Sequence, residues 1–213
     1  GNSRIKEEDI QIETEEGLLI VEVKGIGGTS TDSECSQISK IKHRRCKERN
    51  AFDVFALYLV NHQRYLPPLK RKNPPFTKEQ KGDATNDERG LLSTWQLYNL
   101  YFDIQNGILS KREARSSFID YGLVEFKPKN ILLLDEPKEF FRNNYVCIVN
   151  ITSTMIRVGD EILVEKNGQF TKVKIVSIKQ DNKQLKQVSS GEIGLEFDTQ
   201  IKKKSKLTSL RFL

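Results

Sequence analysis

The first apolar segments of the chain have the spacing of β-strands. Isoleucine alternates with polar residues over residues 9–13, the sequence TEEG follows, and a mainly apolar run then covers residues 18–24. Alternation is typical of a strand with one buried face, and a short continuous run is typical of a strand buried on both faces. The pattern therefore predicts a β-hairpin whose second strand lies inside a sheet.

A helix and another strand are predicted next. A glycine-rich stretch is followed by residues 34–49, which have helical character, and Thr31, Asp32 or Ser33 is a suitable N-cap. Residues 52–60, FDVFALYLV, form a second apolar run of strand length. The order strand, strand, helix, strand is typical of an α/β fold.

The central part of the chain alternates between irregular and helical patterns. Residues 61–76 contain four prolines and are predicted to be irregular. Residues 77–88 are predicted to be helical, and residues 90–107 to form a short strand that enters a helix ending at a glycine. Residues 109–122 predict one further short helix.

From about residue 125 the pattern changes to short apolar runs separated by turns. Evenly spaced runs of this kind favour a small barrel or sandwich, so we expect two domains, residues 1–124 and 125–213. Closed or nearly closed antiparallel β-structure is predicted for residues 130–210. Its predicted core includes Val164, Val173, Ile175 and Ile193.

Composition narrows the classes of function. The 213 residues are enough for one large domain or two small ones, and 30% of them are charged. The apolar runs are only strand-sized and no secretory signal is present, so no membrane partner is expected and a cytoplasmic location is the default. A net charge of +6 favours an anionic partner, commonly nucleic acid, although many basic proteins are merely soluble.

The cysteines do not predict a metal centre. Cys35, Cys46 and Cys147 form no CxxC pair, and although Cys35, His43 and Cys46 could share a helical face, a fourth zinc ligand is not found in the sequence. Reduced cysteines packed in a cytosolic fold are the favoured interpretation.

Two charged residues interrupt the otherwise apolar strand predicted for residues 18–24. Glu22 and Lys24 are two residues apart and therefore point to the same face of the strand. Charges in a buried strand need a partner or a metal. The hairpin can bring Asp9 close to them, which gives the spacing D-x12-E-x-K. Two carboxylates suit Mg²⁺, which prefers oxygen ligands and keeps several waters, and a lysine beside them suits phosphodiester hydrolysis.

These residues resemble the motif of the PD-(D/E)xK nuclease superfamily. The matching segments are EDIQIE, LLIVEVKG and the helix that carries Gln37. The resemblance implies a restriction-endonuclease-like mixed sheet flanked by helices. It also implies that Asp9, Glu22 and the carbonyl of Val23 bind Mg²⁺, that Lys24 orients or activates the attacking water, and that Gln37 faces the site.

The tripeptide (D/E)xK alone carries no information, because it recurs at Glu79, Glu125, Glu136 and Asp181. Only Glu22 ends a buried strand that follows a hairpin aspartate. An ordinary salt bridge at a strand end is the alternative interpretation of the pair.

Two departures from the family pattern remain. Residue 8 is Glu where the family usually has Pro. Only eight residues precede Asp9, whereas the family core has a helix and a strand there. The chain is therefore expected either to be part of a longer protein or to have a trimmed core.

Basic residues in two segments are the predicted contacts to a nucleic-acid backbone. In the helix over 34–49 a solvated charged face is the alternative, and in the segment 61–76 a proline-stiffened surface loop is the alternative. The residues concerned are Lys40, Lys42, Arg44, Arg45, Arg64, Lys70 and Arg71.

The C-terminal region resembles the β-barrel of domain 2 of translational GTPases such as elongation factor Tu. The resemblance rests on residues 156–185, IRVGDEILVEKNGQFTKVKIVSIKQDNKQL, and on 188–198, VSSGEIGLEFD. No GTP-binding motif is present, so a barrel is implied and GTPase activity is not.

The sequence therefore favours an α/β fold of the restriction-endonuclease type followed by a small antiparallel β-barrel. The expected function is Mg²⁺-dependent hydrolysis of nucleic acid, with DNA favoured over RNA. The alternatives are a non-catalytic nucleic-acid-binding module that keeps this fold and a translation-associated factor led by the barrel.

Overall fold

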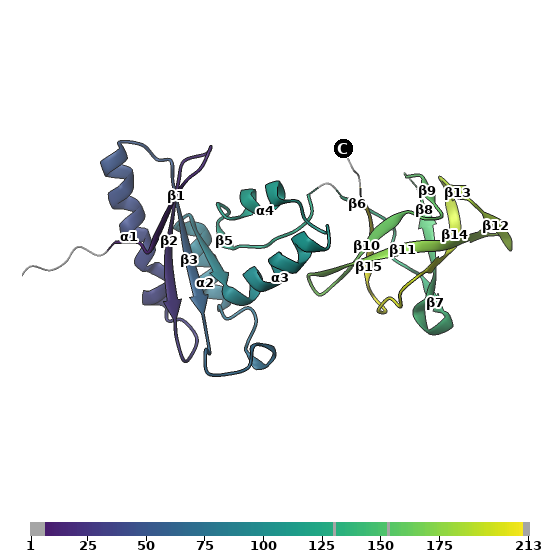
Figure 1. The fold of residues 1–213 in the computed structure, drawn as a ribbon, viewed down its shortest axis with the longest axis horizontal. Coiled ribbons are helices and arrows are strands. Elements are labelled where there is room, and N and C mark those ends of the chain that lie inside the picture. Colours follow the sequence, from purple (N-terminus) through teal and green to yellow (C-terminus); the bar gives the residue numbers. More distant parts are fainter. Residues whose placement is uncertain (1–6, 130, 153, 211–213) are drawn as a thin grey trace, which may run out of the picture. The chain divides into compact units, whose positions relative to one another are not determined.

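A computed structural model of the chain describes residues 7–129, 131–152 and 154–210. The chain divides into two compact units, one comprising Gly1–Ile104 with Leu109–Lys127 and the other Gln105–Ile108 with Pro128–Leu213 (Figure 1). Within the described ranges, no helix is both long enough and apolar enough to cross a membrane.

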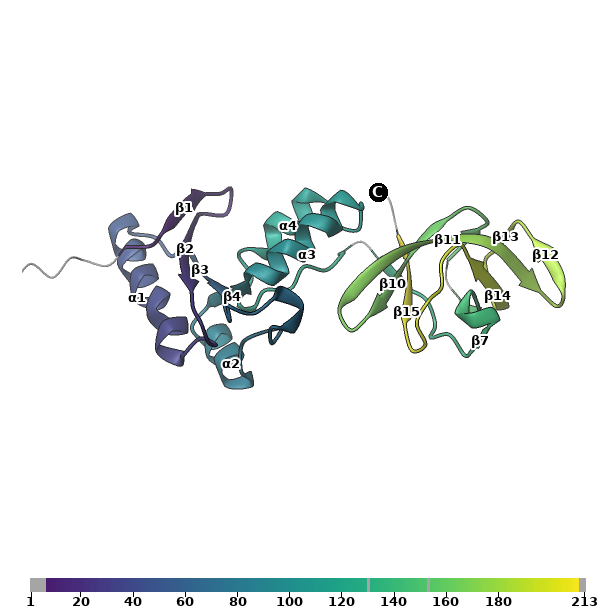
Figure 2. The same cartoon turned by 60° about the horizontal axis from the view of Figure 1, so that its bottom comes forward.

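The first unit is built on a five-stranded mixed sheet in the order β1-β2-β3-β4-β5. β1 is antiparallel to β2 at one edge (Figure 2), and the remaining neighbours are parallel. The strands are β1 (Ile10–Glu13), β2 (Leu18–Gly25), β3 (Val54–Asn61), β4 (Arg89–Ser93) and β5 (Gly122–Leu123). The helices are α1 (Asp32–Arg49), α2 (Lys78–Asn86), α3 (Thr94–Gln105) and α4 (Lys111–Ser117), with a short 3₁₀ helix at Pro68–Lys70.

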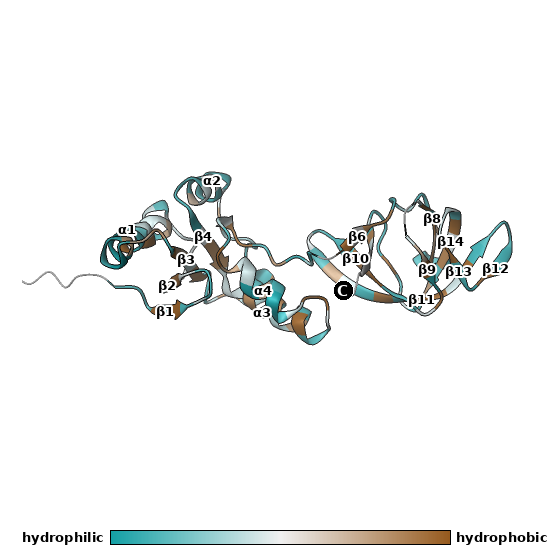
Figure 3. Cartoon of the chain, turned by 90° about the horizontal axis from the view of Figure 1, so that it is seen from above, coloured by the Kyte–Doolittle hydropathy of each residue, from teal (hydrophilic) through white to brown (hydrophobic). Residues whose placement is uncertain are grey.

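Helices cover both faces of this sheet (Figure 3). On one face, Ile38 of α1 and Ala84 of α2 pack with strand residues such as Ile20 and Tyr58. On the other face, the core around Leu57 and Leu92 is completed by residues of α3 and of the segment after α4. Because both faces are buried, the central strands are apolar almost throughout, as their sequences predicted.

Local sequence signals fix where the helices begin. The side chain of Thr31 accepts a hydrogen bond from the backbone N–H of Glu34, and the Glu34 side chain accepts one from the N–H of Thr31. Thr77 and Ser110 cap α2 and α4 with the same reciprocal pattern. Each of these capping boxes satisfies backbone donors that the first helical turn leaves unpaired.

The second unit consists almost entirely of antiparallel strands. The main sheet has eight strands, seven of them in the order β6-β15-β10-β11-β14-β8-β7 with β12 paired to β11, and β9 pairs with β13. The strands are β6 (Ile131–Leu133), β7 (Glu139–Phe141), β8 (Val146–Ile151), β9 (Ile156–Arg157), β10 (Glu161–Lys166), β11 (Gln169–Gln180), β12 (Lys183–Leu185), β13 (Gln187–Val188), β14 (Gly191–Phe197) and β15 (Lys206–Leu210), with a short 3₁₀ segment at Arg142–Asn144.

This sheet is a curled half-barrel. The long strand β11 pairs with β10 along one part and with β14 along another, and the register shifts between Ile175 and Ser177. Irregularities of this kind bend a strand and let a sheet curl. The barrel expected from the resemblance does not close, because β6 and β7 pair with one neighbour each among the described residues.

The concave side of the half-barrel holds its own apolar core. The four residues predicted for it all belong to one buried cluster, so this part of the prediction is confirmed. Cys147 lies in the same cluster, and burial raises the pKa of its thiol to about 12. That thiol is therefore protonated and unreactive at neutral pH.

Candidate active site

The β1–β2 hairpin places Asp9 beside the second half of β2. A tight turn closes the hairpin, with the Thr14 N–H donating to the carbonyl of Gly17 at 2.8 Å. Ile10 then lies opposite Val21, so the next residue outward, Asp9, donates its own N–H to the Val21 carbonyl at 3.0 Å. The Oδ2 atom of Asp9 accepts a hydrogen bond from the N–H of Val23 at 2.7 Å. The carboxylate of Asp9 is thus fixed at the N–H of the Glu22–Val23 peptide.

Two side chains converge on one oxygen of Glu22. The Nε2 of Gln37, from α1, donates to Oε1 of Glu22 at 3.1 Å, and the Nζ of Lys24 lies 2.5 Å from the same atom. Only 3% of the Glu22 surface is exposed, whereas a third of the Lys24 side chain is. A buried carboxylate needs such partners because removing it from water is costly.

The surroundings keep Lys24 charged. Its hydrogen bond to Glu22 raises the pKa of Lys24 above its ordinary value, burial acts in the opposite direction, and the negative charges of Glu22, Asp9 and Glu34 add to the rise. The ammonium is therefore protonated at neutral pH, so that it acts as a charged hydrogen-bond donor and not as a proton acceptor.

A buried polar network holds the segment before α1 and with it Gln37. The hydroxyl of Tyr58, the residue opposite Glu22 on β3, lies 2.9 Å from Oγ of Ser30. Nε2 of Gln80, on α2, donates to the Ser30 carbonyl and to Oδ1 of Asp32, both at 2.9 Å. Because these contacts join β3, α1 and α2, they position the start of α1 over β2. No local sequence signal indicates this network, because its hydrogen-bonded partners are 28 to 50 residues apart.

The predicted nucleic-acid contacts on α1 are largely occupied by carboxylates. Arg45 forms a bidentate pair with Glu8 at 2.7 and 3.0 Å, and Arg44 also lies within 4 Å of Glu8. Lys42 pairs with Glu88 at 3.2 Å. Among the described residues no ion pair is recorded for Lys40, which is exposed. The sequence pattern could not show these pairs, because most of the partners come from other segments.

The pair of Glu8 and Arg45 anchors the residue next to Asp9 to α1. The side chain of Glu8 is fully buried. Burial raises the pKa of this carboxyl, but the hydrogen bond and charge of Arg45 and the charge of Arg44 outweigh it and hold the pKa below the ordinary value. A carboxyl with a lowered pKa stabilises the folded state above its ordinary pKa, and this contribution is lost as the pH falls.

This linkage gives a testable prediction. Lowering the pH from about 6 to about 3.5 should reduce the unfolding free energy of the first unit, and Glu8→Gln should reduce the size of that change. At pH 6 the variant should already be less stable than the wild type, by about 1.5–3 kcal/mol. Urea unfolding followed by the fluorescence of Trp95, the single tryptophan, measures this unit. An identical pH dependence in both proteins would contradict the assigned role of Glu8.

The loop over residues 61–76 lies against the glycine-rich segment that follows β2. The N–H groups of Gln63 and Arg64 donate to the carbonyls of Gly28 and Ile26 at 2.9 and 3.0 Å. The guanidinium of Arg64 reaches the carbonyl of Gly25, the residue after Lys24, at 3.2 Å. Arg64 is therefore placed beside the cluster of Glu22 and Lys24.

The other basic residues of this loop have different surroundings. Arg71 donates to Oδ1 of Asn61 at 2.6 Å and to the carbonyl of Leu66 at 2.9 Å, so it holds the loop together. Lys70 is exposed at the end of the 3₁₀ helix. Tyr65 is also exposed, and its ring lies under the Arg64 guanidinium.

The donor set around Glu22 fits a hard divalent cation. Asp9 and Glu22 supply carboxylate oxygens, and no bond is recorded for Oδ1 of Asp9 or Oε2 of Glu22 among the described residues. Among the described residues there is no group of three or more His, Cys, Asp or Glu side chains that could hold a metal. Two carboxylates with water as the remaining ligands match the preference of Mg²⁺.

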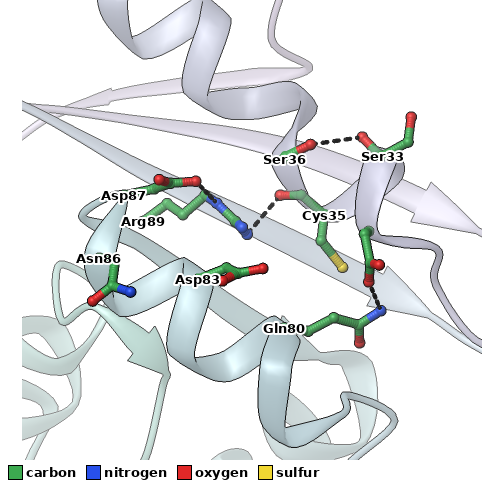
Figure 4. A pocket seen from close by; sticks show the side chains of 9 residues that line it. Ser33, Cys35, Ser36, Gln80, Asp83, Asn86, Asp87 and Arg89 are labelled. Carbon is green, nitrogen blue, oxygen red and sulfur yellow. Dashed lines mark hydrogen bonds and ion pairs between the residues drawn. The ribbon is translucent and has the colours of Figure 1, made fainter.

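A hollow of about 430 Å³ lies on the side of α1 that faces α2 (Figure 4). Asp32, Asp83 and Asp87 surround it, and the buried Arg89 donates to Oδ2 of Asp87 at 3.3 Å and to the Cys35 carbonyl at 2.8 Å. The guanidinium offsets one of the three carboxylate charges. The hollow lacks the convergent arrangement seen at Glu22, so we assign it no chemistry.

Comparisons with known proteins do not identify a family. No family model and no curated protein matches the sequence. The C-terminal domain of a putative U32 peptidase from Geobacillus thermoleovorans is 13% identical, with 38% of this chain and 98% of that chain covered and a TM-score of 0.28.

Two further structures are similar over more of this chain. Translation elongation factor SelB from Methanococcus maripaludis is 14% identical over 90% of this chain, with a TM-score of 0.30. GDP-bound aIF5B from Aeropyrum pernix is 14% identical over 86% of this chain, also with a TM-score of 0.30. The chain spans only 39% and 28% of these two proteins. Similarity of this extent carries no argument about function.

Proposed function

We propose that the chain is a Mg²⁺-dependent nuclease of the PD-(D/E)xK type that hydrolyses phosphodiester bonds in DNA. The supporting observation is the convergence of Lys24 and Gln37 on one oxygen of Glu22, with Asp9 held at the adjacent Val23 N–H. Burial alone accounts for the two donors on Glu22, but a structural salt bridge at a strand end would not need the hairpin aspartate beside it. The proposal includes a restriction-endonuclease-like fold for residues 1–124 and, for residues 125–213, an open half-barrel related to the barrel of translational GTPases.

Each side chain has a role in this proposal. Asp9, Glu22 and the Val23 carbonyl would hold the cation. When bound, Mg²⁺ would polarise the phosphate and lower the pKa of a coordinated water. The ammonium of Lys24 orients the attacking water and stabilises negative charge that develops on the phosphate. Gln37 fixes the Glu22 carboxylate, and Arg64, beside Gly25, contacts a phosphate of the bound strand.

A cleavage assay tests the proposal. Supercoiled plasmid, single-stranded DNA and RNA are each incubated with the full chain in Mg²⁺ or in EDTA. We expect cutting of the plasmid in Mg²⁺ only, and we expect Glu22→Gln to remove it by replacing a carboxylate with an amide of the same shape. Cutting by Glu22→Gln at the wild-type rate would place the chemistry elsewhere.

A non-catalytic binding module is the second candidate, because the positive charge is unevenly distributed. Residues 1–127 contain 20 Lys and Arg against 19 Asp and Glu, whereas residues 128–213 contain 15 against 10. The net charges are therefore +1 and +5. DNA binding without Mg²⁺-dependent cutting in the assay above would favour this function.

A further inference from the structure

The lysines of the second unit gather most densely in one turn. Four of them lie within residues 202–206, KKKSK, which we call the lysine turn. All four are exposed, whereas the flanking Ile201 and Leu207 are buried in the core of the half-barrel. The turn is therefore anchored at both ends by apolar packing.

Hydrogen bonds define the shape of the lysine turn. Ser205 donates from its N–H and from its Oγ to the carbonyl of Lys202, at 3.2 and 2.6 Å. The Nζ of Lys166, on β10, donates to the carbonyls of Lys203 and Lys204 at 2.8 and 3.2 Å. Lys204 adopts a left-handed conformation with φ of +61°, which helps to reverse the chain. A fifth ammonium group is thus built into the same turn.

No ion pair is recorded for these ammonium groups within the described part of the protein. Glu165 of β10 lies opposite Lys206 in the sheet register, so the excess of positive charge is centred on Lys202, Lys203 and Lys204. The recorded ion pairs of the second unit join Lys138 to Glu192, Arg142 to Glu196 and Lys172 to Glu161, and none involves the lysine turn or Lys166. The cations of α1 behave differently, because most of them are paired with carboxylates. A group of like charges without counter-charges repels itself and is stabilised by a polyanion.

We propose that the lysine turn is a binding surface for the phosphate backbone of duplex nucleic acid. Lysine ammonium groups contact phosphates as point charges and read no sequence. Residues 198–206 contain no aromatic side chain for stacking on unpaired bases, which favours a duplex over a single strand. An anionic membrane is a poorer fit, because the apolar neighbours Ile201 and Leu207 are buried and cannot insert into it.

This binding surface extends the proposed function. The choice of nucleic acid as the polyanion rests on that function. It would supply sequence-independent affinity, while the cluster around Glu22 would carry out the chemistry. Binding measured in EDTA separates the two, since a failure of cleavage leaves binding intact.

The test measures binding of a fluorescein-labelled DNA duplex of about 30 base pairs to the full chain in EDTA, between about 50 and 200 mM salt. The triple variant K202Q/K203Q/K204Q should lower the slope of log K against log salt by about 2.7, and should weaken binding at about 0.1 M salt by at least about tenfold. The matched control K179Q/K183Q/K186Q removes the same charge from the region of β11 and β12, where Asp181 lies. Its slope should change by less than about 1.

Three results would overturn the proposal: wild-type binding by the triple variant, equal loss in both triple variants, or loss of binding to phosphatidylserine vesicles without loss of DNA binding. Far-UV circular dichroism checks that each variant is folded. If the triple variant is not folded, the single variant Lys203→Gln provides the measurement, with an expected change in slope of about 0.9. An unchanged slope in that variant would equally refute the proposal.

Discussion

Replacing Lys24 by alanine is expected to abolish Mg²⁺-dependent cleavage while most of the DNA affinity remains. The ammonium lies 2.5 Å from Oε1 of Glu22 and its pKa is raised. In the proposed mechanism it acts where charge develops in the transition state. The expected loss in the rate of the chemical step is about 10²–10⁴-fold, or roughly 3–5 kcal/mol. Single-turnover cleavage and DNA binding in EDTA measure the two effects separately.

Lys40→Ala is the matched control for this variant. It removes one positive charge from an exposed position of α1 for which no ion pair is recorded in the described residues. It should weaken DNA binding slightly and lower the salt slope by at most about 1, without slowing the chemical step. If Lys24→Ala is folded and cuts at the wild-type rate, the assignment of the site is wrong.

Gly17→Ala is expected to cause the largest loss of stability. Gly17 closes the β1–β2 hairpin at φ of +142°, and an added Cβ would lie 2.0 Å from the carbonyl oxygen of Asp53. That oxygen also accepts the N–H of Leu18 at 2.8 Å, so the backbone cannot move away without losing a hydrogen bond. We expect the unfolding free energy of the first unit to fall by about 2–4 kcal/mol, measured by urea unfolding with Trp95 fluorescence.

Gly82→Ala provides a control for which the expected change in unfolding free energy has the opposite sign. Gly82 lies within α2, and a Cβ added there meets no atom within 4 Å. Alanine should therefore stabilise the same unit by about 0.5–1 kcal/mol, because it restricts the unfolded chain more than glycine does. Equal stability of Gly17→Ala and the wild type would show that the hairpin turn relaxes freely, which would also remove the reason for a fixed position of Asp9.

The consequences of the hairpin for the site follow from strand geometry. Side chains alternate between the faces of a strand, so a register shift of one residue would move Asp9 away from the Val23 N–H. The turn at Gly17 therefore affects more than stability. A variant that distorts it is expected to reduce cleavage even at temperatures where the first unit stays folded.

The sequence by itself determined the secondary structure and much of the core. Periodicity and capping signals are local, so α1 and the strands β2 and β3 follow from residues close together in the chain. The sequence left Thr31, Asp32 and Ser33 as possible caps of α1, and the structure shows that Thr31 is the cap. The apolar alternation of the C-terminal region likewise placed Val173 and Ile193 in the core of the half-barrel. That Asp9, Glu22, Lys24 and Gln37 act in catalysis stays a prediction.

Only the tertiary structure decided which charges are paired. Arg45 pairs with Glu8, which lies 37 residues earlier, and Gln37 donates to Glu22, which lies 15 residues earlier. The sheet register and the packing of α1 bring these segments together. No local pattern encodes such pairs, so a run of basic residues on α1 was indistinguishable from a nucleic-acid contact. The half-barrel was equally undecided, since closure depends on hydrogen bonding between the first and last strands of a sheet and not on the alternation within each strand.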